Sequence, residues 1–424
     1  MEVLAGVIFV FMYMVIVSEK IHRTVAAMLG ATSMILLGIL SQETALHHID
    51  FNTLGLLVGM MVLVGVTSHT GLFDYVAIKA AKVAKAEPKR ILIYLALITA
   101  VFSAFLDNVT TVLLMVPVTF SITQKLHLKA NPFLLTQIIA SNIGGTATLI
   151  GDPPNIMIGS AVGLSFVDFI VNLTPPAIVI FVVTVAIMLA LYGSKLHTQP
   201  ELQDKVMRLN EYSQITDAVL LKKCLFVLAV TMSMFVLHGA LHLETATAAL
   251  TGAGLLLLIT FSHNEEMIAK MLSKVEWLAI FFFGGLFILV GALVETGVIK
   301  MLAEEAIKIT QGDVTLTAMI ILWMSAIASA FIDNIPFVAT MIPLIKDMGQ
   351  MGLTNLDPMW WSLALGACLG GNGTLIGASA NVVVASMAAQ RGRAISFIGF
   401  MKVAFPLMIL SIIISTVYVY LRYL

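Results

Sequence analysis

The sequence has few charged residues. Asp, Glu, Lys and Arg make up only 11% of its 424 residues, whereas soluble domains carry about 25%. Hydrophobic residues make up 59%, and the mean hydropathy is +1.01. Apolar runs of about 17 to 23 residues recur from end to end, and each is long enough to cross a bilayer. The composition therefore excludes an ordinary soluble protein and predicts an all-α membrane protein.

Cysteine is also scarce, since the chain has only Cys224 and Cys368, far apart in the sequence. This excludes a disulfide framework and any site with three thiolate ligands. The phosphate-binding pattern Gly-x-x-x-x-Gly-Lys-[Ser/Thr] is absent, so an ATPase would have to be a separate subunit. We expect no cofactor, no bound metal, no nucleic-acid partner and no enzymatic activity.

What the chain does have is an internal repeat at a fixed offset of 226 residues. The stretch 105–117 (FLDNVTTVLLMVP) returns as 331–343 (FIDNIPFVATMIP). The stretch 144–155 (GGTATLIGDPPN) returns as 370–381 (GGNGTLIGASAN) without a gap. Polar and glycine-rich segments that are duplicated in an apolar chain are typical of a transporter built from two halves.

The apolar runs predict about ten transmembrane helices. The first run lacks a basic segment and a cleavage site, so we interpret it as a span and not as a signal peptide. Two runs, 132–165 and 357–388, are over-long and contain the glycine-rich repeats, which predicts discontinuous helices. The predicted spans are 3–18, 24–41, 52–70, 132–165, 172–193, 220–240, 245–262, 276–296, 357–388 and 398–421.

Two further apolar pairs, 91–124 and 316–350, are interrupted at their Asp-Asn dipeptides. Each arm is only about 12 to 16 residues, which is short for a span, so each pair predicts a re-entrant hairpin. Two shorter segments, 71–88 and 297–312, place lysines at helical spacing among apolar residues. We expect these two segments to be helices that lie along the membrane interface.

Basic residues give the orientation. With ten spans and two hairpins, only Lys300, Lys308, Lys346 and Arg422 fall on one side, which leaves 19 of the 23 basic residues on the other. The positive-inside rule makes the basic side cytoplasmic and places both termini outside. The helices 52–70 and 276–296 then run in opposite directions, so the predicted repeats have inverted topology, with hairpins that converge near the midplane.

This arrangement predicts three segments. Residues 1–193 form the first inverted repeat, residues 194–219 a polar cytoplasmic linker, and residues 220–424 the second inverted repeat. We expect a multi-pass protein of the cytoplasmic (inner) membrane of a prokaryote, either monomeric or a homodimer.

Three carboxylates fall in the interrupted segments. A charged side chain in the bilayer core costs at least about 2.5–3.5 kcal/mol, so Asp107, Asp152 and Asp333 are candidates for ion or proton coupling. Asp107 and Asp333 occupy equivalent positions, whereas Asp152 is replaced by Ala378 in the second half. A carboxylate that is present in one half only suits a specific ligand or proton. The alternative for all three is a buried helix-capping carboxylate.

Polar and glycine residues of the same segments are candidates for substrate binding. Their amides and hydroxyls can donate and accept hydrogen bonds, and unwound backbone offers free N–H and C=O groups. The alternative is structural, since Asn is a good helix cap and Gly permits close packing. The candidates are Asn108, Thr110, Thr111, Gly145, Thr146, Thr148, Asn155, Asn334, Gly371, Asn372, Thr374 and Asn381.

These motifs resemble the ion transporter superfamily, and specifically its ArsB/NhaD branch. The sequences FLDNVTT (105–111) and GDPPN (151–155) look most like the bacterial relatives of the melanosomal P protein. The two Asp-Asn tips are similar to the hairpin-tip Ser-Asn-Thr motif of related dicarboxylate/sodium symporters, although Pro336 departs from it. The resemblance implies that both tips and both unwound loops surround the substrate and the coupling ion.

The resemblance further implies an antiporter. The leading expectation is efflux of arsenite or antimonite, exchanged against protons, from a polar pocket that needs no thiolates. The alternative is a Na+/H+ antiporter that uses the same residues, and a carboxylate or other anion symporter is less favoured because Asp at both tips repels an anion. The partners would be a small inorganic substrate, protons and the lipid bilayer.

Overall fold

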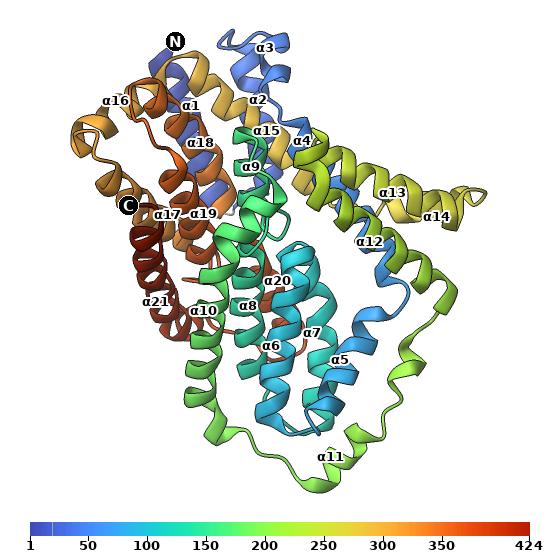
Figure 1. The fold of residues 1–424 in the computed structure, drawn as a ribbon. Helices are drawn as coiled ribbons and strands as arrows, with labels where there is room; N and C mark the ends of the chain where they lie inside the picture. Colours follow the sequence, from blue (N-terminus) through green and yellow to red (C-terminus); the bar gives the residue numbers. More distant parts are fainter. Residues whose placement is uncertain (19) are drawn as a thin grey trace.

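The computed structural model describes residues 1–18 and 20–424, and every regular element in these ranges is a helix (Figure 1). The all-α prediction is thus confirmed. The first half contains α1 (Glu2–Ser18), α2 (Arg23–Leu36), α3 (Gln42–His47), α4 (Phe51–Ser68), α5 (Leu72–Val83), α6 (Pro88–Phe105), α7 (Asn108–Lys125), α8 (Asn131–Thr146), α9 (Pro153–Val162) and α10 (Phe166–Tyr192).

The second half repeats this order of helices. A linker of short helices joins the two halves, namely η1 (Gly193–Lys195), α11 (Pro200–Met207) and η2 (Glu211–Gln214). The second half contains α12 (Ala218–Leu241), α13 (Thr245–Phe261), α14 (Glu265–Leu272), α15 (Trp277–Glu295), α16 (Val298–Thr310), α17 (Val314–Phe331), α18 (Asn334–Gln350), α19 (Asp357–Gly370), α20 (Ser379–Gln390) and α21 (Phe397–Tyr423).

Seven helices of the described residues, α4, α6, α10, α12, α15, α17 and α21, are long and apolar enough to cross a membrane. Helices α1, α2 and α13 are apolar but shorter. The predicted span 24–41 ends early, because α2 stops at Leu36 and a turn through Gly38, with φ +69°, precedes α3. The first arms of both predicted hairpins, α6 and α17, have 18 residues each and are thus longer than expected.

Equivalent helices make equivalent contacts in the two halves. Helix α6 packs against α7 and α8, as α17 packs against α18 and α19. The α6–α7 hairpin lies in the lower part of Figure 1 and the α17–α18 hairpin in the upper left part. Each broken helix crosses over, because α9 contacts α18 and α20 contacts α7. The connected ends of both hairpins therefore meet the unwound segments in the middle of the molecule.

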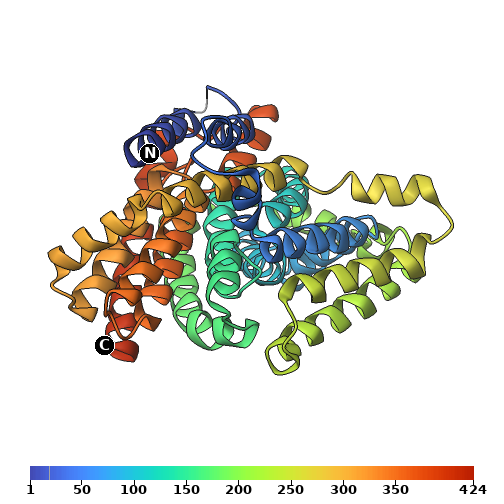
Figure 2. The same cartoon turned by 90° about the horizontal axis from the view of Figure 1, so that it is seen from above.

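The outer helices are exchanged between the halves. Helix α2 of the first half packs against α15, and α13 of the second half packs against α4 (Figures 1 and 2). Glycines at equivalent positions allow this contact, since a Cβ on Gly59 would lie 2.8 Å from the Ala249 carbonyl oxygen, and one on Gly285 would lie 2.8 Å from that of Ala27. The two halves thus share one intertwined core.

Both predicted discontinuous helices are interrupted. Helix α8 ends at Thr146 and α9 begins at Pro153, while α19 ends at Gly370 and α20 begins at Ser379. Glycine brings these segments close to the hairpins. A Cβ on Gly144 would lie 2.1 Å from the Ala100 carbonyl oxygen, so only glycine permits this contact between α8 and α6.

Candidate functional site

Two asparagines hold the unwound segments in shape. The Asn155 side chain donates to the carbonyl oxygens of Thr146 (3.1 Å) and Thr148 (2.8 Å), across the break between α8 and α9. Asn381 does the same in the second half, with Gly371 (2.7 Å) and Thr374 (2.8 Å). Both side chains satisfy carbonyls that the broken helices leave without partners. These contacts favour the structural interpretation of Asn155 and Asn381.

The predicted threonines make similar internal bonds. Thr146 donates to the Asn142 carbonyl oxygen at 2.7 Å. Thr148 and Thr374 donate to carbonyl oxygens at the ends of α6 and α17, respectively. The Thr111 hydroxyl differs, because it is buried and has no protein partner. Thr148 and Thr374 therefore connect the unwound segments to α6 and α17, whereas Thr146 bonds within its own helix α8.

The first hairpin tip carries Asp107 and Asn108. Asp107 caps α7, because its side chain accepts a 2.8 Å hydrogen bond from the Thr110 N–H. Among the ion pairs of residues 1–18 and 20–424, none includes Asp107. Asn108 donates to Asn142 at 3.2 Å, and Asn142 donates in turn to Asn372 at 2.9 Å. An amide chain thus joins the first tip to the unwound segment of the second half.

The second hairpin tip is built differently. Asp333 also caps its helix, through the Ile335 N–H at 3.2 Å, but it forms an ion pair with Arg23 at the start of α2. Arg23 also donates to Ser379 at 3.0 Å, and its guanidinium lies 5.1 Å from the centre of the Phe282 ring. The second carboxylate therefore has a cation of the chain beside it, whereas the first has none among the described residues.

Asp152 is the most buried of the three carboxylates, with 1% of its surface exposed. One carboxylate oxygen lies 3.4 Å from the Asn334 amide, and the other, Oδ2, has no protein partner. Ala378 occupies the equivalent position in the second half. Because a buried polar atom without a partner is costly, Asp152 is a candidate to bind an ion or to carry a proton.

These groups surround a cavity of about 200 Å³. Asp107, Asn108, Asp152 and Asn334 line it from the tips and the first unwound segment. Arg23 and Glu276, from the starts of α2 and α15, also line it, and sequence analysis did not select either. Asp333 lines a neighbouring cavity of about 350 Å³, which shares Arg23 and Ser379 with the first.

The inverted repeat supplies a second, equivalent cavity. It measures about 380 Å³, and Asp50 lies in it at the position equivalent to Glu276 in the first cavity, 226 residues earlier. Phe287 and Met157, which line the second cavity, are likewise the counterparts of Met61 and Val383, which line the first. Neither hairpin tip lines this second cavity. The tips are therefore connected to one of two equivalent cavities, and not to both.

The predicted site residues fall into three groups. Asp107, Asn108, Asp152 and Asn334 line the central cavity, and Asp333 lines its neighbour. Asn372 contributes to the buried amide chain, and its Nδ2 has no protein partner. The remaining predicted residues line neither cavity and lie beside the tips or in the unwound segments, namely Thr110, Thr111, Gly145, Thr146, Thr148, Asn155, Gly371, Thr374 and Asn381.

Sequence reasoning missed Arg23, Glu276 and Asn142. Arg23 was assigned to a cytoplasmic loop, but α1 and α2 are short, so the start of α2 reaches the hairpin tip. Glu276 had a signal, because it is the counterpart of Asp50 at the same offset. Asn142 is the counterpart of Cys368, and a polar residue opposite an apolar one marks a difference between the halves.

Comparisons with known proteins agree with this architecture. The model of the family described as "Citrate transporter" (CitMHS) matches residues 13–366. An uncharacterized transporter of Mycobacterium tuberculosis is 44% identical over 429 residues, which cover 100% of this chain and 99% of the relative. The human P protein is 36% identical over 500 residues, and the alignment covers 98% of this chain but only 59% of the P protein.

A solved structure with the same fold is that of the Alcanivorax borkumensis YdaH transporter, whose topology is described as unusual. Its TM-score is 0.61 at 14% sequence identity, and the match covers 89% of this chain and 87% of the other. The resemblance to relatives of the P protein is confirmed. The narrower assignment to the ArsB/NhaD branch stays a prediction.

Proposed function

The chain belongs to the citrate transporter (CitMHS) family of membrane transporters, and from this premise we propose that it is a secondary active exchanger of cations against protons. The observation that carries the proposal is the charge around the central cavity. Asp107, Asp152 and Glu276 line it directly, and Arg23 is the one cation among the described residues that line it. An excess of carboxylates attracts a cation and repels a free anion.

Asp152 is the group that we assign to proton coupling. It is buried without a countercharge, and one of its oxygens has no protein partner. Burial of this kind favours the neutral, protonated acid. A cation that enters the cavity would stabilise the charged carboxylate, so binding of the cation and release of the proton would be linked at this residue.

The two equivalent cavities support alternating access. In an inverted-repeat transporter, each half can take the conformation of the other, which exchanges the side of the membrane that reaches the site. Here the cavity with Glu276 reaches the tips, and the cavity with Asp50 does not. Under the predicted orientation the connected cavity faces the cytoplasm, so we assign this structure to an inward-facing state.

Exchange of arsenite or antimonite against protons is the second candidate. The observation in its favour is the amide chain from Asn108 through Asn142 to Asn372, which can donate to and accept from a neutral, hydroxyl-bearing solute. It ranks second because three of the predicted threonine hydroxyls already bond to backbone and line neither cavity. Citrate would have to enter with its charge neutralised by a bound cation.

The test is transport by the purified protein in liposomes with a trapped pH-sensitive dye. We expect an outward sodium gradient to drive proton uptake, with no movement of arsenite. Arsenite, antimonite and citrate with and without Mg²⁺ are assayed in parallel. Arsenite–proton exchange without a sodium response would replace the first candidate by the second, and citrate uptake alone would overturn both.

The variant Asp152→Asn tests the assigned residue, because it keeps the shape of the side chain and removes its charge. Sodium-driven proton flux should fall to the level of empty liposomes. If this variant retained full exchange, Asp152 would have no coupling role.

A further inference from the structure

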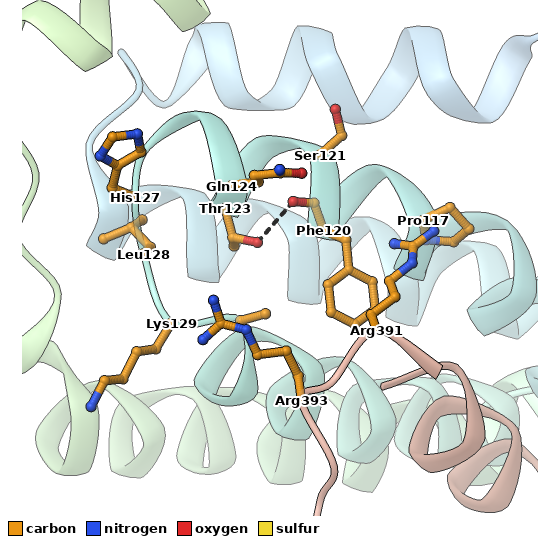
Figure 3. A pocket seen from close by; sticks show the side chains of 11 residues that line it. Pro117, Phe120, Ser121, Thr123, Gln124, His127, Leu128, Lys129, Arg391 and Arg393 are labelled. Atoms are coloured by element: carbon orange, nitrogen blue, oxygen red, sulfur yellow. Dashed lines mark hydrogen bonds between the residues drawn. The ribbon is translucent and has the colours of Figure 1, made fainter. Parts of the chain in front are cut away.

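A large cavity lies outside the transport site, at the end of the molecule that carries the linker. It measures about 880 Å³ and lies between α7, the turn from α7 to α8 and the loop after α20 (Figure 3). Lys129, Arg391 and Arg393 line it together with the polar side chains of Ser121 and Gln124. We call it the basic basin. The transport mechanism proposed above uses none of these residues.

The cations of the basic basin have no ionic partner in the part of the chain that the structure describes. Among the described residues, no ion pair or side-chain hydrogen bond includes Lys129, Arg391 or Arg393. Arg391 lies over the ring of Phe120, with its guanidinium 4.4 Å from the ring centre. Stacking fixes this side chain while leaving its N–H groups free to donate.

The backbone holds both arginines on one turn. Gly392, with φ +67°, ends α20, and the Arg393 N–H donates to the Ala388 carbonyl oxygen at 2.8 Å. This pattern is the Schellman motif, in which a left-handed glycine closes the helix. Arg391 and Arg393 therefore flank a fixed glycine instead of lying in a loose loop.

The start of α8 adds further positive potential. Its N-cap is Ala130, which lines the basin and provides no side-chain cap, and its first residue is Asn131. The N-terminus of a helix carries partial positive charge. In the second half α19 also lacks a side-chain cap, but Asp357 stands at the position of Asn131 and offsets this charge.

The equivalent turns in the repeat can be compared with those that form the basic basin. The turn between α18 and α19, residues 351–356, contains no charged residue, and neither does the turn after α9, residues 163–165. The same turns therefore form at the opposite end without a cation of their own, although Lys346 of α18 stands at the position of Phe120. The positive-inside rule accounts for basic residues on this side of the molecule, but it does not account for three of them around one cavity, two on a turn fixed by Gly392.

We propose that the basic basin binds a phosphate group. Two free arginines, one lysine and an uncapped helix N-terminus suit an oxyanion with several acceptor oxygens. An adjoining cavity of about 700 Å³ shares Lys129 and Arg393 and adds the half-buried side chains of Tyr192 and Ile395. An anionic phospholipid would place its headgroup in the basin and its chains against this wall, whereas a free phosphate ester would use the basin alone.

The experiment measures the thermal unfolding midpoint of the full chain in nanodiscs. One arm compares phosphatidylglycerol with phosphatidylcholine, and a second arm titrates inorganic phosphate against chloride at equal ionic strength in phosphatidylcholine. We expect phosphatidylglycerol to raise the midpoint. The double variant Arg391→Gln with Arg393→Gln should bind it at least about tenfold more weakly, because charge-assisted hydrogen bonds are lost.

The matched control removes two cations from the same end of the chain, outside the basin. Lys205→Gln with Arg208→Gln changes exposed residues of the linker helix by the same net charge. We expect this control to bind as the unchanged protein does. An equal loss in the control would show attraction by general surface charge and overturn the proposal.

A third variant copies the other half. Asn131→Asp places at the start of α8 the carboxylate that α19 has at Asp357, and it should weaken phosphate binding without lowering the midpoint in phosphatidylcholine. If the double arginine variant does not fold, Asn131→Asp and Lys129→Gln test the same site. A response to inorganic phosphate alone assigns the basin to a soluble ester, and no response in either arm rejects it.

Discussion

The two hairpin tips have the same backbone and different electrostatics. Asp107 and Asp333 each cap the second helix of their hairpin. Among the described residues, Asp333 forms an ion pair, with Arg23, and Asp107 forms none. The duplicated carboxylate therefore caps a helix in both halves. Arg23 neutralises the charge of Asp333, whereas the charge of Asp107 stays available to a ligand.

The difference follows from the exchange of the outer helices. Helix α2 begins beside the second tip, where Thr24 also donates to the Leu278 carbonyl oxygen at 2.7 Å. The equivalent helix α13 begins elsewhere, with Ala246 donating to the Asn52 side chain at 2.8 Å. The repeat determines which residue caps the second helix of each hairpin. Whether the charge of that residue is available to a ligand depends on a side chain from the exchanged outer helix.

The largest expected effect comes from the residue that has no counterpart. Asp152→Asn should abolish proton-coupled exchange, measured as dye-detected flux in liposomes, because it removes the unpaired buried carboxylate. Ala378→Asp, which gives the second half the same carboxylate, should not restore flux to the Asp152→Asn protein, because Arg23 lines the same cavity as residue 378 and would neutralise the new carboxylate. Recovery of flux in that double variant would show that the two halves are interchangeable at this position.

The second prediction compares the tips directly. Asp107→Asn should stop exchange but change the free energy of unfolding by less than about 0.5 kcal/mol, because Asn caps a helix as well as Asp does. Asp333→Asn leaves Arg23 without its partner and should cost about 1–3 kcal/mol. Denaturant unfolding of both proteins checks the difference.

A double-mutant cycle with Arg23→Gln tests the pair itself. Arg23→Gln with Asp333→Asn should recover part of the stability lost in each single variant, with a coupling energy of about 1–3 kcal/mol. Additive losses would mean that the two side chains do not interact in the folded protein.

The third prediction concerns packing, in which the halves should agree. Gly144→Ala and Gly370→Ala should each cost about 1–3 kcal/mol, because the added Cβ overlaps neighbouring backbone. The first should cost more, since its Cβ would lie 2.1 Å from the Ala100 carbonyl oxygen, against 2.5 Å from that of Ala326 for the second. Gly254→Ala, where the space is open, should be neutral or stabilising by up to about 1 kcal/mol.

The smallest effect is expected at α5 and α16, the two helices that the sequence predicts to lie along the membrane interface. Helix α5 is tied to the linker, since Lys82 lies 2.6 Å from Glu211, whereas on α16 Lys308 pairs only with Glu305 of the same helix. The bond from Lys82 holds the pKa of Glu211 below its usual 4.5. The stabilising effect of the Lys82–Glu211 ion pair is therefore present above about pH 4.5 and is lost as the pH falls below that value.

Limited proteolysis of the linker between pH 3.5 and 7 measures this effect. Cleavage should accelerate at the acid end in the unchanged protein and should be fast at every pH in Glu211→Gln. Glu305→Gln should leave linker cleavage unchanged. A linker that is cut equally in all three proteins would show that this ion pair does not hold it.

The sequence predicted the architecture well because repetition is visible without a structure. The 226-residue offset makes α18 the counterpart of α7 and α20 the counterpart of α9, and glycine-rich stretches indicated both breaks. Span lengths were less predictable. The interruption after Leu36 depends on a turn at Gly38, and an apolar run alone cannot show where a helix stops for such a turn.

The site was only partly predictable, because the sequence shows which residues are equivalent but not which elements touch. Asp152 stood out as a carboxylate without a counterpart. Arg23 is 310 residues from Asp333, and no local pattern joins them. The sequence allowed two roles for Asn155, structural capping and ligand binding. Its hydrogen bonds to Thr146 and Thr148 depend on the conformation of the break between α8 and α9, which the sequence does not show.

The exchanged outer helices have a consequence for biogenesis. While the ribosome is still making the first half, α2 can pack against α1 but lacks its main partner, because α15 begins only at Trp277. Gly59 on α4 likewise waits for Ala249 on α13. The nascent chain must therefore hold unfinished helices in the membrane until late in synthesis. Premature termination in the second half would leave both repeats incomplete, and quality-control proteases would meet an unpacked chain instead of one folded repeat.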